Sequence, residues 1–473
     1  MDTTATHEAS PPTERRLHGN LGVLGVSFMV IAGAAPLTVV GGPMALGLAT
    51  GNGAGLPAAY LATLVVLLLF VTGFTAMTPQ VRSAGAFYSY VHAGLGRIAG
   101  IGTGYAALLS YVSLYIGVYA LFGTGLDALV VSFGGPSVPW WLWGAVGLCV
   151  ISFLGYRNIE LSGKILGVLL VAEVGIVLVL DARIVFGGGH EGMSTGFISP
   201  TTIFSGAPGV ALLFAVLSFV GIEATAVFRD EARDPAKTIP RATFLSVTSV
   251  GIFYAVTCWA LISAVGDSRI ADTAAAGPET LLPSLSAQYL GRIGTDLTST
   301  LFVTSIFAAG LTFHNVVSRY LFSLSSQDLL PRGLSVTHPL HGSPHRSSVT
   351  STVAVIAGLS GAVLTGLDPM AELYTWTAGL ASVGYVVLLV LTCLAVLVFF
   401  RRRSEKHSTA RTVVAPALGL AGLLVILVMM LFNLDLLAGN NRVVSVAIVA
   451  SLLVAYALGP IVGRLLPASG QRE

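Results

Sequence analysis

Twelve long apolar runs divide the chain, and they constrain its fold more than any other feature. The runs cover residues 22–47, 56–77, 99–131, 139–155, 162–186, 206–229, 243–266, 295–326, 348–366, 371–400, 412–434 and 441–462. A helix needs roughly 20 apolar residues to cross the hydrocarbon core of a bilayer. Because that core offers no water to backbone amides, such segments must bond internally as helices. We therefore predict an all-α membrane protein with twelve transmembrane helices.

The composition excludes the common classes of soluble protein. Only 10% of the residues are charged and 54% are hydrophobic, whereas a soluble domain carries about 25% charged residues. The net charge of +2 gives no basic excess for nucleic acid, so we expect the lipid bilayer as partner and no nucleic acid. The sequence makes no prediction of oligomeric state.

The sequence also lacks the patterns of an enzyme. No Ser/His/Asp set, metal-ligand spacing or Walker A sequence is found along the 473 residues. We therefore expect no enzyme activity, no cofactor and no metal site. Transport by such a chain would draw on an ion gradient instead of ATP.

The Lys and Arg residues give the orientation, since cytoplasmic loops of membrane proteins are enriched in both. An even number of spans places the two termini on one side, which we assign to the cytoplasmic face of the plasma membrane. The tails 1–21 and 463–473 are then cytoplasmic. Of the 24 Lys and Arg residues, 20 fall on that side, and those left outside are Arg183, Arg269, Arg292 and Arg442.

The first and sixth apolar runs each contain an interruption near the middle. The first contains Gly33-Ala34-Ala35-Pro36, where the proline has no amide hydrogen and clashes with the preceding turn. The interruption in the sixth run contains Gly221 but no proline. Broken helices at matching positions of two halves indicate the site of a secondary transporter. The alternative is that Gly and Pro are simply tolerated in membrane helices.

Two carboxylates lie near the middle of a predicted span, Glu173 in the fifth and Glu223 in the sixth. Placing a carboxylate there costs at least ~2.5 kcal/mol on insertion scales, so such residues usually serve a function. Burial disfavours the charged form, which makes both residues candidates for proton coupling. The alternative for each is a protonated carboxyl group that only bonds to a neighbouring helix.

Three segments resemble signature motifs of the amino acid–polyamine–organocation (APC) superfamily. Residues 218–242 resemble its sixth helix and the E-x-x-x-P-x-x-x-x-P-R-A loop that follows. Residues 83–91 resemble the glycine–tyrosine motif of the loop between helices 2 and 3, and residues 318–331 resemble the end of helix 8. The resemblance extends over essentially the whole chain.

The resemblance implies a LeuT-like fold of two inverted five-helix repeats, a 5+5 arrangement. The repeats would comprise residues 22–186 and 206–400, with peripheral helices 11 and 12 in residues 412–462. The implied function is a permease that imports amino acids or related amines with protons. The alternatives are an amino acid/amine exchanger and a sodium-coupled symporter. A membrane sensor is disfavoured because the chain has no soluble output domain.

The resemblance also implies where a substrate carboxylate binds. In the family, backbone amides in the helix 1 break hold this group, and they map onto Gly33, Ala34 and Ala35. Unpaired amides at the start of a half-helix, together with the positive end of its dipole, suit an anion. The family usually has a Gly-Ser-Gly type sequence here, so two positions without a side chain are lost.

The family binds the substrate α-amino group through helix 6 carbonyls, which map onto Phe219, Val220 and Ile222. The resemblance implies that Phe219 is an aromatic gate over the substrate. Glu223 matches the glutamate of a Phe-x-Gly-x-Glu pattern, which takes part in pH-dependent coupling in a related arginine/agmatine exchanger.

Helix 5 departs from the family pattern. Many prokaryotic relatives have a lysine eleven residues after a serine, and counting from Ser162 this chain has Glu173. A carboxylate there can be neutralised in two ways: it can take up a proton, or it can help to hold sodium. We favour the proton.

Overall fold

The computed structural model describes residues 21–81, 86–157, 163–225, 232–338, 343–403 and 408–465. Within these ranges the chain is helical, and its only β pairing is an isolated bridge between Leu21 and Ala232. Ten helices of the described part are long and apolar enough to cross a membrane. The prediction of an all-α membrane protein is therefore confirmed. The predicted tails 1–20 and 466–473, and the motif residues 83–85 and 226–231, lie outside the described residues.

Within the described residues, each predicted apolar run is mostly helical. The first half contains α1 (Val23–Gly33), α2 (Pro36–Val39), the π-helical turn η1 (Val40–Met44), α3 (Ala45–Thr50), α4 (Leu56–Met77), α5 (Ala86–Leu95), α6 (Arg97–Ser132), α7 (Trp140–Tyr156) and α8 (Gly163–Phe186). The rest contains α9 (Pro200–Ile203), α10 (Pro208–Leu217), α11 (Pro235–Val265), α12 (Ile270–Ala276), α13 (Pro278–Ser326), α14 (His345–Thr365), the π-helical turns η7 (Pro369–Tyr374) and η8 (Ala410–Val414), α15 (Thr375–Arg401), α16 (Ala415–Phe432), α17 (Leu434–Leu437) and α18 (Arg442–Leu465).

The outer helices turn apolar side chains away from the protein. Phe153 on α7, Val353 on α14, Val425 on α16 and Val454 on α18 are all exposed. A soluble monomer rarely exposes apolar patches of this extent. These faces therefore fit contact with lipid, as the apolar runs predict.

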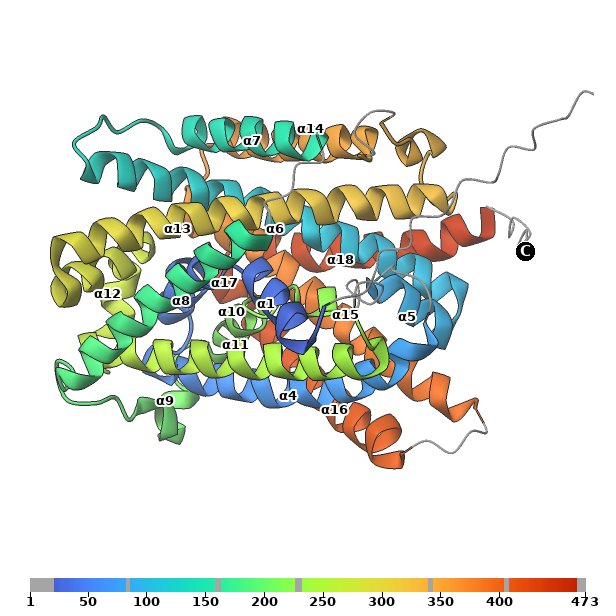
Figure 1. The fold of residues 1–473 in the computed structure, drawn as a ribbon, viewed down its shortest axis with the longest axis horizontal. Helices are drawn as coiled ribbons and strands as arrows, with labels where there is room; N and C mark the ends of the chain where they lie inside the picture. Colours follow the sequence, from blue (N-terminus) through green and yellow to red (C-terminus); the bar gives the residue numbers. More distant parts are fainter. Residues whose placement is uncertain are drawn as a thin grey trace, which may run out of the picture.

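The long helices pack in pairs around the two interrupted ones. Helices α4 and α11 lie side by side along one edge of the view, and α7 and α14 lie side by side along the opposite edge (Figure 1). Helices α6 and α13 pack against each other between these edges, and α1 and α10 lie near the centre. Segments that are far apart in sequence thus surround both interruptions.

Some element boundaries differ from the predicted ones. Helix α13 begins at Pro278 instead of residue 295, because a helical segment precedes a kink at Gly291, whose φ of 69° and ψ of −170° are not helical. Helix α11 begins at Pro235 instead of residue 243. The short helix α5, between the second and third predicted spans, was not expected. Hydropathy locates apolar runs, and these additions are polar or short.

The core is rich in aromatic side chains with a hydroxyl group. Tyr60, Tyr115, Tyr254, Tyr374 and Tyr385 are among the largest fully buried side chains. A buried tyrosine combines a large apolar ring with a hydroxyl that needs a hydrogen-bond partner. The centre of the bundle can therefore be closely packed and still carry polar groups.

Candidate functional site

The first interruption lies at the predicted residues. Helix α1 ends at Gly33, and Ala35 adopts a left-handed conformation with φ 48° and ψ 70° before Pro36 begins α2. A left-handed backbone costs a non-glycine residue about 1–2 kcal/mol, so the surrounding packing must hold this break in place. The Ala34 and Ala35 amides donate to carbonyls of α1, at 3.1 Å to Val30 and 3.2 Å to Ala32.

The amides that the break releases belong to the next two residues after the proline. The Leu37 amide donates to Glu173 Oε2 at 3.4 Å, and the Thr38 amide donates to Ser305 Oγ at 3.2 Å. Ser305 in turn donates to Glu173 Oε2 at 2.8 Å and accepts from the Thr38 hydroxyl at 2.9 Å. A buried carboxylate from α8 and a hydroxyl from α13 thus cap the half-helix. This differs from the expectation of unpaired amides at the break.

The second interruption is built around Glu223. Helix α10 ends at Leu217, Gly221 has φ 106°, and residues 222–225 form a 3-10 turn. The positive φ suits glycine, which has no Cβ to clash. The Gly221 amide donates to Glu223 Oε2 at 3.0 Å, so a carboxylate caps this break as well.

Two tyrosines from neighbouring helices reach the same carboxylate. Tyr111 on α6 donates to Glu223 Oε1, and Tyr385 on α15 donates to Oε2 at 3.0 Å. Glu223 is only 6% exposed. Three donors on one buried carboxylate satisfy most of its acceptor capacity. The network ties α6, the α10 break and α15 together through one titratable group.

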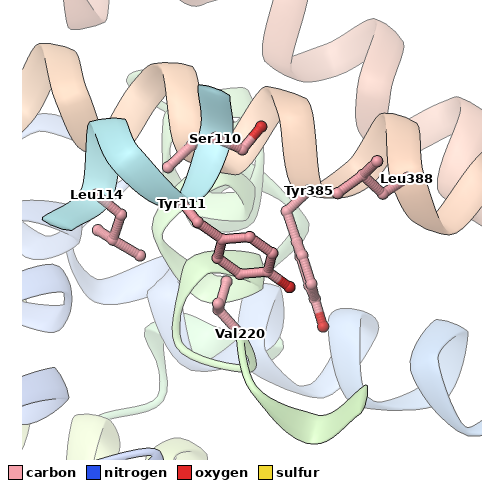
Figure 2. Close-up of a pocket in the computed structure, with 7 residues that line it drawn as sticks. Ser110, Tyr111, Leu114, Val220, Tyr385 and Leu388 are labelled. Carbon is pink, nitrogen blue, oxygen red and sulfur yellow. The ribbon is translucent and has the colours of Figure 1, made fainter. Parts of the chain in front are cut away.

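A small cavity lies directly beside this network. It is lined by residues of α6, the α10 break and α15, namely Ser110, Tyr111, Leu114, Val220, Ala381, Tyr385 and Leu388. The ring of Tyr111 lies above Val220, and the ring of Tyr385 lies beside it on the side to which the Tyr111 hydroxyl points (Figure 2). The cavity wall and the Glu223 network therefore share two residues.

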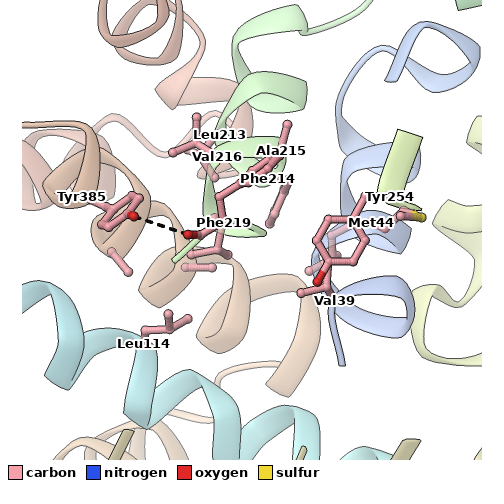
Figure 3. Packing of buried hydrophobic residues seen from close by; sticks show 14 of the residues in the cluster. Val39, Met44, Leu114, Leu213, Phe214, Ala215, Val216, Phe219, Tyr254 and Tyr385 are labelled. Carbon is pink, nitrogen blue, oxygen red and sulfur yellow. Dashed lines mark hydrogen bonds between the residues drawn. The ribbon is translucent and has the colours of Figure 1, made fainter. Parts of the chain in front are cut away.

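The helix 6 carbonyls that the resemblance assigns to a substrate amine have partners inside the protein. The Phe219 carbonyl accepts from the Tyr385 hydroxyl at 3.3 Å (Figure 3). The Ile222 carbonyl accepts from the Thr225 hydroxyl at 3.0 Å. The Phe219 ring is fully buried and packs edge-on against Tyr254, with the ring centroids 6.3 Å apart.

The structure gathers the predicted site residues into two places. Gly33, Ala34 and Ala35 form the first break, and Glu173 caps the half-helix that follows it. The second break contains Phe219, Val220, Ile222 and Glu223, of which Val220 lines the cavity. The two carboxylates belong to two separate hydrogen-bond networks.

Sequence reasoning missed three residues. Ser305 and Tyr385 contact Glu173 and Glu223 from 132 and 162 residues away along the chain, and no local pattern marks them. Asp181 was counted among the acidic residues away from the middle of a span. It is only 4% exposed, and Thr257 donates to its Oδ2 at 2.7 Å. The signal for Asp181 was its position within the apolar run 162–186.

Comparison with known proteins agrees with this architecture. The profile of the amino acid permease family matches residues 21–456. The low-affinity putrescine importer PlaP of Escherichia coli (strain K12) is 24% identical over 363 residues, covering 74% of this chain and 77% of PlaP. The branched-chain amino acid permease BcaP of Bacillus subtilis (strain 168) is 24% identical over 409 residues, covering 82% and 81%.

A third relative is the probable GABA permease of Pseudomonas aeruginosa (strain PAO1). It is 27% identical over 386 residues, which cover 78% of this chain and 76% of that protein. The family profile spans nearly the whole chain, including both helix breaks and both capping carboxylates. The chain is therefore a multi-pass membrane transport protein that belongs to the amino acid permease family, within the APC superfamily.

Proposed function

We propose that this chain is a secondary active transporter that imports an amino acid or a related amine across the plasma membrane with protons. The observation that carries the proposal is the position of Glu223. Its carboxylate caps the α10 break and accepts hydrogen bonds from Tyr111 and Tyr385, which also line the cavity. A change in its protonation would alter the break and the cavity wall together. A ligand or proton shifts a conformational equilibrium only through different affinities for the two states.

The substrate class follows from the relatives, whose names include a putrescine importer, a branched-chain amino acid permease and a probable GABA permease. All three names describe compounds with an amine, and two of them describe compounds with a carboxylate. We assign the amine to the Phe219, Val220 and Ile222 side of the site and the carboxylate to Gly33, Ala34 and Ala35.

The proposed topology is twelve spans in two inverted repeats of five, residues 22–186 and 206–400, followed by two peripheral helices in residues 412–462. Each half begins with a broken helix, and each has a short helical segment between its second and third spans. These segments are α5 in the first half, and α12 with the start of α13 in the second. Both termini face the cytoplasm, as the distribution of Lys and Arg indicates.

Topology can be tested with single cysteines. Thr337 and Ser268 are exposed in connections that the proposal places on opposite sides of the membrane. In a background with Cys149, Cys258 and Cys393 replaced by alanine, an impermeant maleimide should label Ser268→Cys in intact cells. It should label Thr337→Cys only after permeabilisation. Labelling of both from outside would contradict the proposed orientation.

Transport is tested with purified protein in proteoliposomes. Putrescine, leucine, phenylalanine and 4-aminobutyrate are offered under an inward proton gradient, with choline in place of all sodium. Accumulation of one of them that collapses with a protonophore supports the proposal. Uptake only when the vesicles are preloaded with substrate would indicate an exchanger, and strict sodium dependence would indicate sodium symport.

The sodium alternative has one structural observation in its favour. Ser305 Oγ lies 2.8 Å from Glu173 Oε2 and 2.9 Å from Thr38 Oγ1, and oxygen ligands suit hard cations. We favour protons because the Ser305 hydroxyl donates to the carboxylate, and a bound cation would have to displace that hydrogen bond.

A further inference from the structure

A third buried carboxylate lies on α8, eight residues beyond Glu173. Asp181 is only 4% exposed, and it takes no part in the two networks that cap the helix breaks. At 1.5 Å of rise per residue, it lies about 12 Å from Glu173 along the helix axis. In the proposed orientation it is the outer of the two carboxylates on this helix.

Among the described residues, only one of the two Asp181 oxygens has a hydrogen-bond partner. The Thr257 hydroxyl on α11 donates to Oδ2 at 2.7 Å. Within the part of the chain that the structure describes, Oδ1 is buried without a partner. A buried polar atom without a partner is rare and calls for an explanation, such as water, an ion or a functional role. A proton on this oxygen would remove the buried charge.

A second buried polar group without a partner among the described residues lies on α11, the helix that contacts Asp181 through Thr257. Tyr254 precedes Thr257 by one turn of α11, and its fully buried hydroxyl has no hydrogen bond among the described residues. The same hydroxyl lies within electrostatic range of Glu173. A hydroxyl can accept one proton and donate another, so Tyr254 can connect two carboxyl groups without changing its own state.

The other titratable groups around Asp181 are few in the described residues. On α11, Cys258 lies within electrostatic range of Asp181 and is fully buried. On α8 itself, Arg183 is directed to the surface, where its Nε donates to the Tyr289 carbonyl of α13. Helices α1 and α2, which also pack on α8, contain no titratable side chain. No cation among these groups offsets a negative charge on Asp181 directly.

At its outer end α13 contributes one further pair of charges. Arg292 and Asp296 approach each other to 3.9 Å, with most of the arginine side chain exposed. This pair lies at the surface, and it provides a half-buried carboxylate, paired with an arginine, at the same end of the bundle. It therefore serves as the matched control for Asp181.

We propose that Asp181 is a further proton-binding site beside Glu173 and Glu223, which takes up a proton from the outer side and passes it through the Tyr254 hydroxyl and water to Glu173. The inference rests on the proposed proton-coupled transport. In the transfer, the O–H bond of protonated Asp181 breaks while Tyr254 gains that proton and releases its own to Glu173. Glu173 gains one O–H bond, Asp181 becomes a carboxylate and Tyr254 is unchanged.

The competing role for Asp181 is a static hydrogen bond that holds α8 against α11. The two roles separate by substitution. In Asp181→Asn the side-chain oxygen still accepts from Thr257, but the group no longer titrates. In Thr257→Val the acid remains and the hydrogen bond is lost. If the role is static, Thr257→Val should reduce substrate-driven proton entry more than Asp181→Asn does. If Asp181 binds the proton, Asp181→Asn should reduce it more.

The experiment uses proteoliposomes loaded with a pH-sensitive dye and the first substrate identified among putrescine, leucine, phenylalanine and 4-aminobutyrate. Substrate-driven proton entry should fall at least tenfold in Asp181→Asn, while substrate counterflow at equal pH should stay within twofold of the unmodified protein. Tyr254→Phe should slow proton entry in the same way. Asp296→Asn should change neither quantity.

Three results would overturn the inference. The first is proton entry in Asp181→Asn that equals that of the unmodified protein. The second is a fall of both proton entry and counterflow in Asp181→Asn, accompanied by a lower melting temperature. The third is a loss of proton entry that appears only when the buffer contains sodium. If the unmodified protein itself takes up substrate but no protons, the proposed proton coupling fails, which distinguishes that failure from the failure of the Asp181 site.

Discussion

The Glu173 carboxylate accepts the Leu37 amide at 3.4 Å, at the start of the half-helix that follows the first break. Helix N-termini favour negative charge because their amides are unpaired and the dipole end is positive. The resemblance implies that a substrate carboxylate binds at Gly33, Ala34 and Ala35. The Glu173 side chain from α8 binds the amide of Leu37, two residues beyond Ala35. Protonation of Glu173 would weaken this cap and make the half-helix more attractive to a second anion.

Glu173→Gln is expected to separate the proton and sodium interpretations. Glutamine keeps an oxygen for Ser305 and Leu37 but cannot gain or lose a proton. With choline replacing sodium, the unmodified protein should accumulate substrate when an inward proton gradient is imposed. Accumulation by Glu173→Gln should be at least tenfold lower. Ser305→Ala, which keeps the acid, should lose less. Strict sodium dependence that disappears in Glu173→Gln would contradict the proton interpretation.

Glu223→Gln is expected to uncouple substrate transport from the proton gradient while the protein still binds substrate. The substitution mimics the protonated acid permanently, so the break and the Tyr111 and Tyr385 contacts should stay in one state. Substrate counterflow should persist, and pH-driven accumulation should be lost. Tyr385→Phe is the matched variant, because it removes one donor to Glu223 and the donor to the Phe219 carbonyl while the acid still titrates.

We therefore expect Tyr385→Phe to weaken substrate binding more than it weakens proton coupling. Its KM should rise severalfold while the ratio of protons to substrate stays that of the unmodified protein. Accumulation by Glu223→Gln under an imposed proton gradient would place the coupling site elsewhere.

The sequence predicted the helices better than it predicted their contacts. Apolar runs set by bilayer thickness identify spans such as α4 and α15 without knowledge of neighbours. The break at Pro36 was also predictable, because proline acts through its own backbone. The amides it releases were expected to be unpaired, however, and their partners Glu173 and Ser305 come from helices far away in sequence.

Asp181 was missed for a related reason. Its distance from the span centre left it out of the candidate residues, but α11 covers it and Thr257 bonds to it. Burial of a polar side chain depends on which helix packs over it, and hydropathy along one chain does not contain that information. The same holds for Tyr385, which lies in an uninterrupted apolar run and still contacts Glu223.

The loop after α13 offers a test of pH dependence outside the spans. Hydrogen bonding to the Arg332 guanidinium lowers the pKa of the Asp328 carboxyl group, and Arg332 Nε lies 2.6 Å from Asp328 Oδ1. A lowered folded-state pKa stabilises the protein above the unfolded value of about 3.9, and this contribution is lost as the pH falls through the folded value. Both residues are at the surface, so the effect should be small.

A double-mutant cycle with Asp328→Asn and Arg332→Gln measures this contribution through melting temperatures. Asparagine tolerates the left-handed backbone of Asp328, whose φ is 60°, so the cycle isolates the charge pair. Coupling should be detectable at pH 7 and smaller at pH 3. Equal coupling at both values would show that the carboxylate charge is not what links the two residues.

Ala35→Gly is expected to stabilise the protein. Ala35 holds φ 48° and ψ 70°, a region that costs a residue with a Cβ about 1–2 kcal/mol and costs glycine almost nothing. Part of this gain is offset because glycine makes the unfolded chain more flexible, by about 0.4–1 kcal/mol. The neighbour Ala34, at φ −73° and ψ −10°, is the matched control, and glycine there should destabilise. Melting temperatures in detergent that move in the same direction for both variants would show that the break is not strained at Ala35.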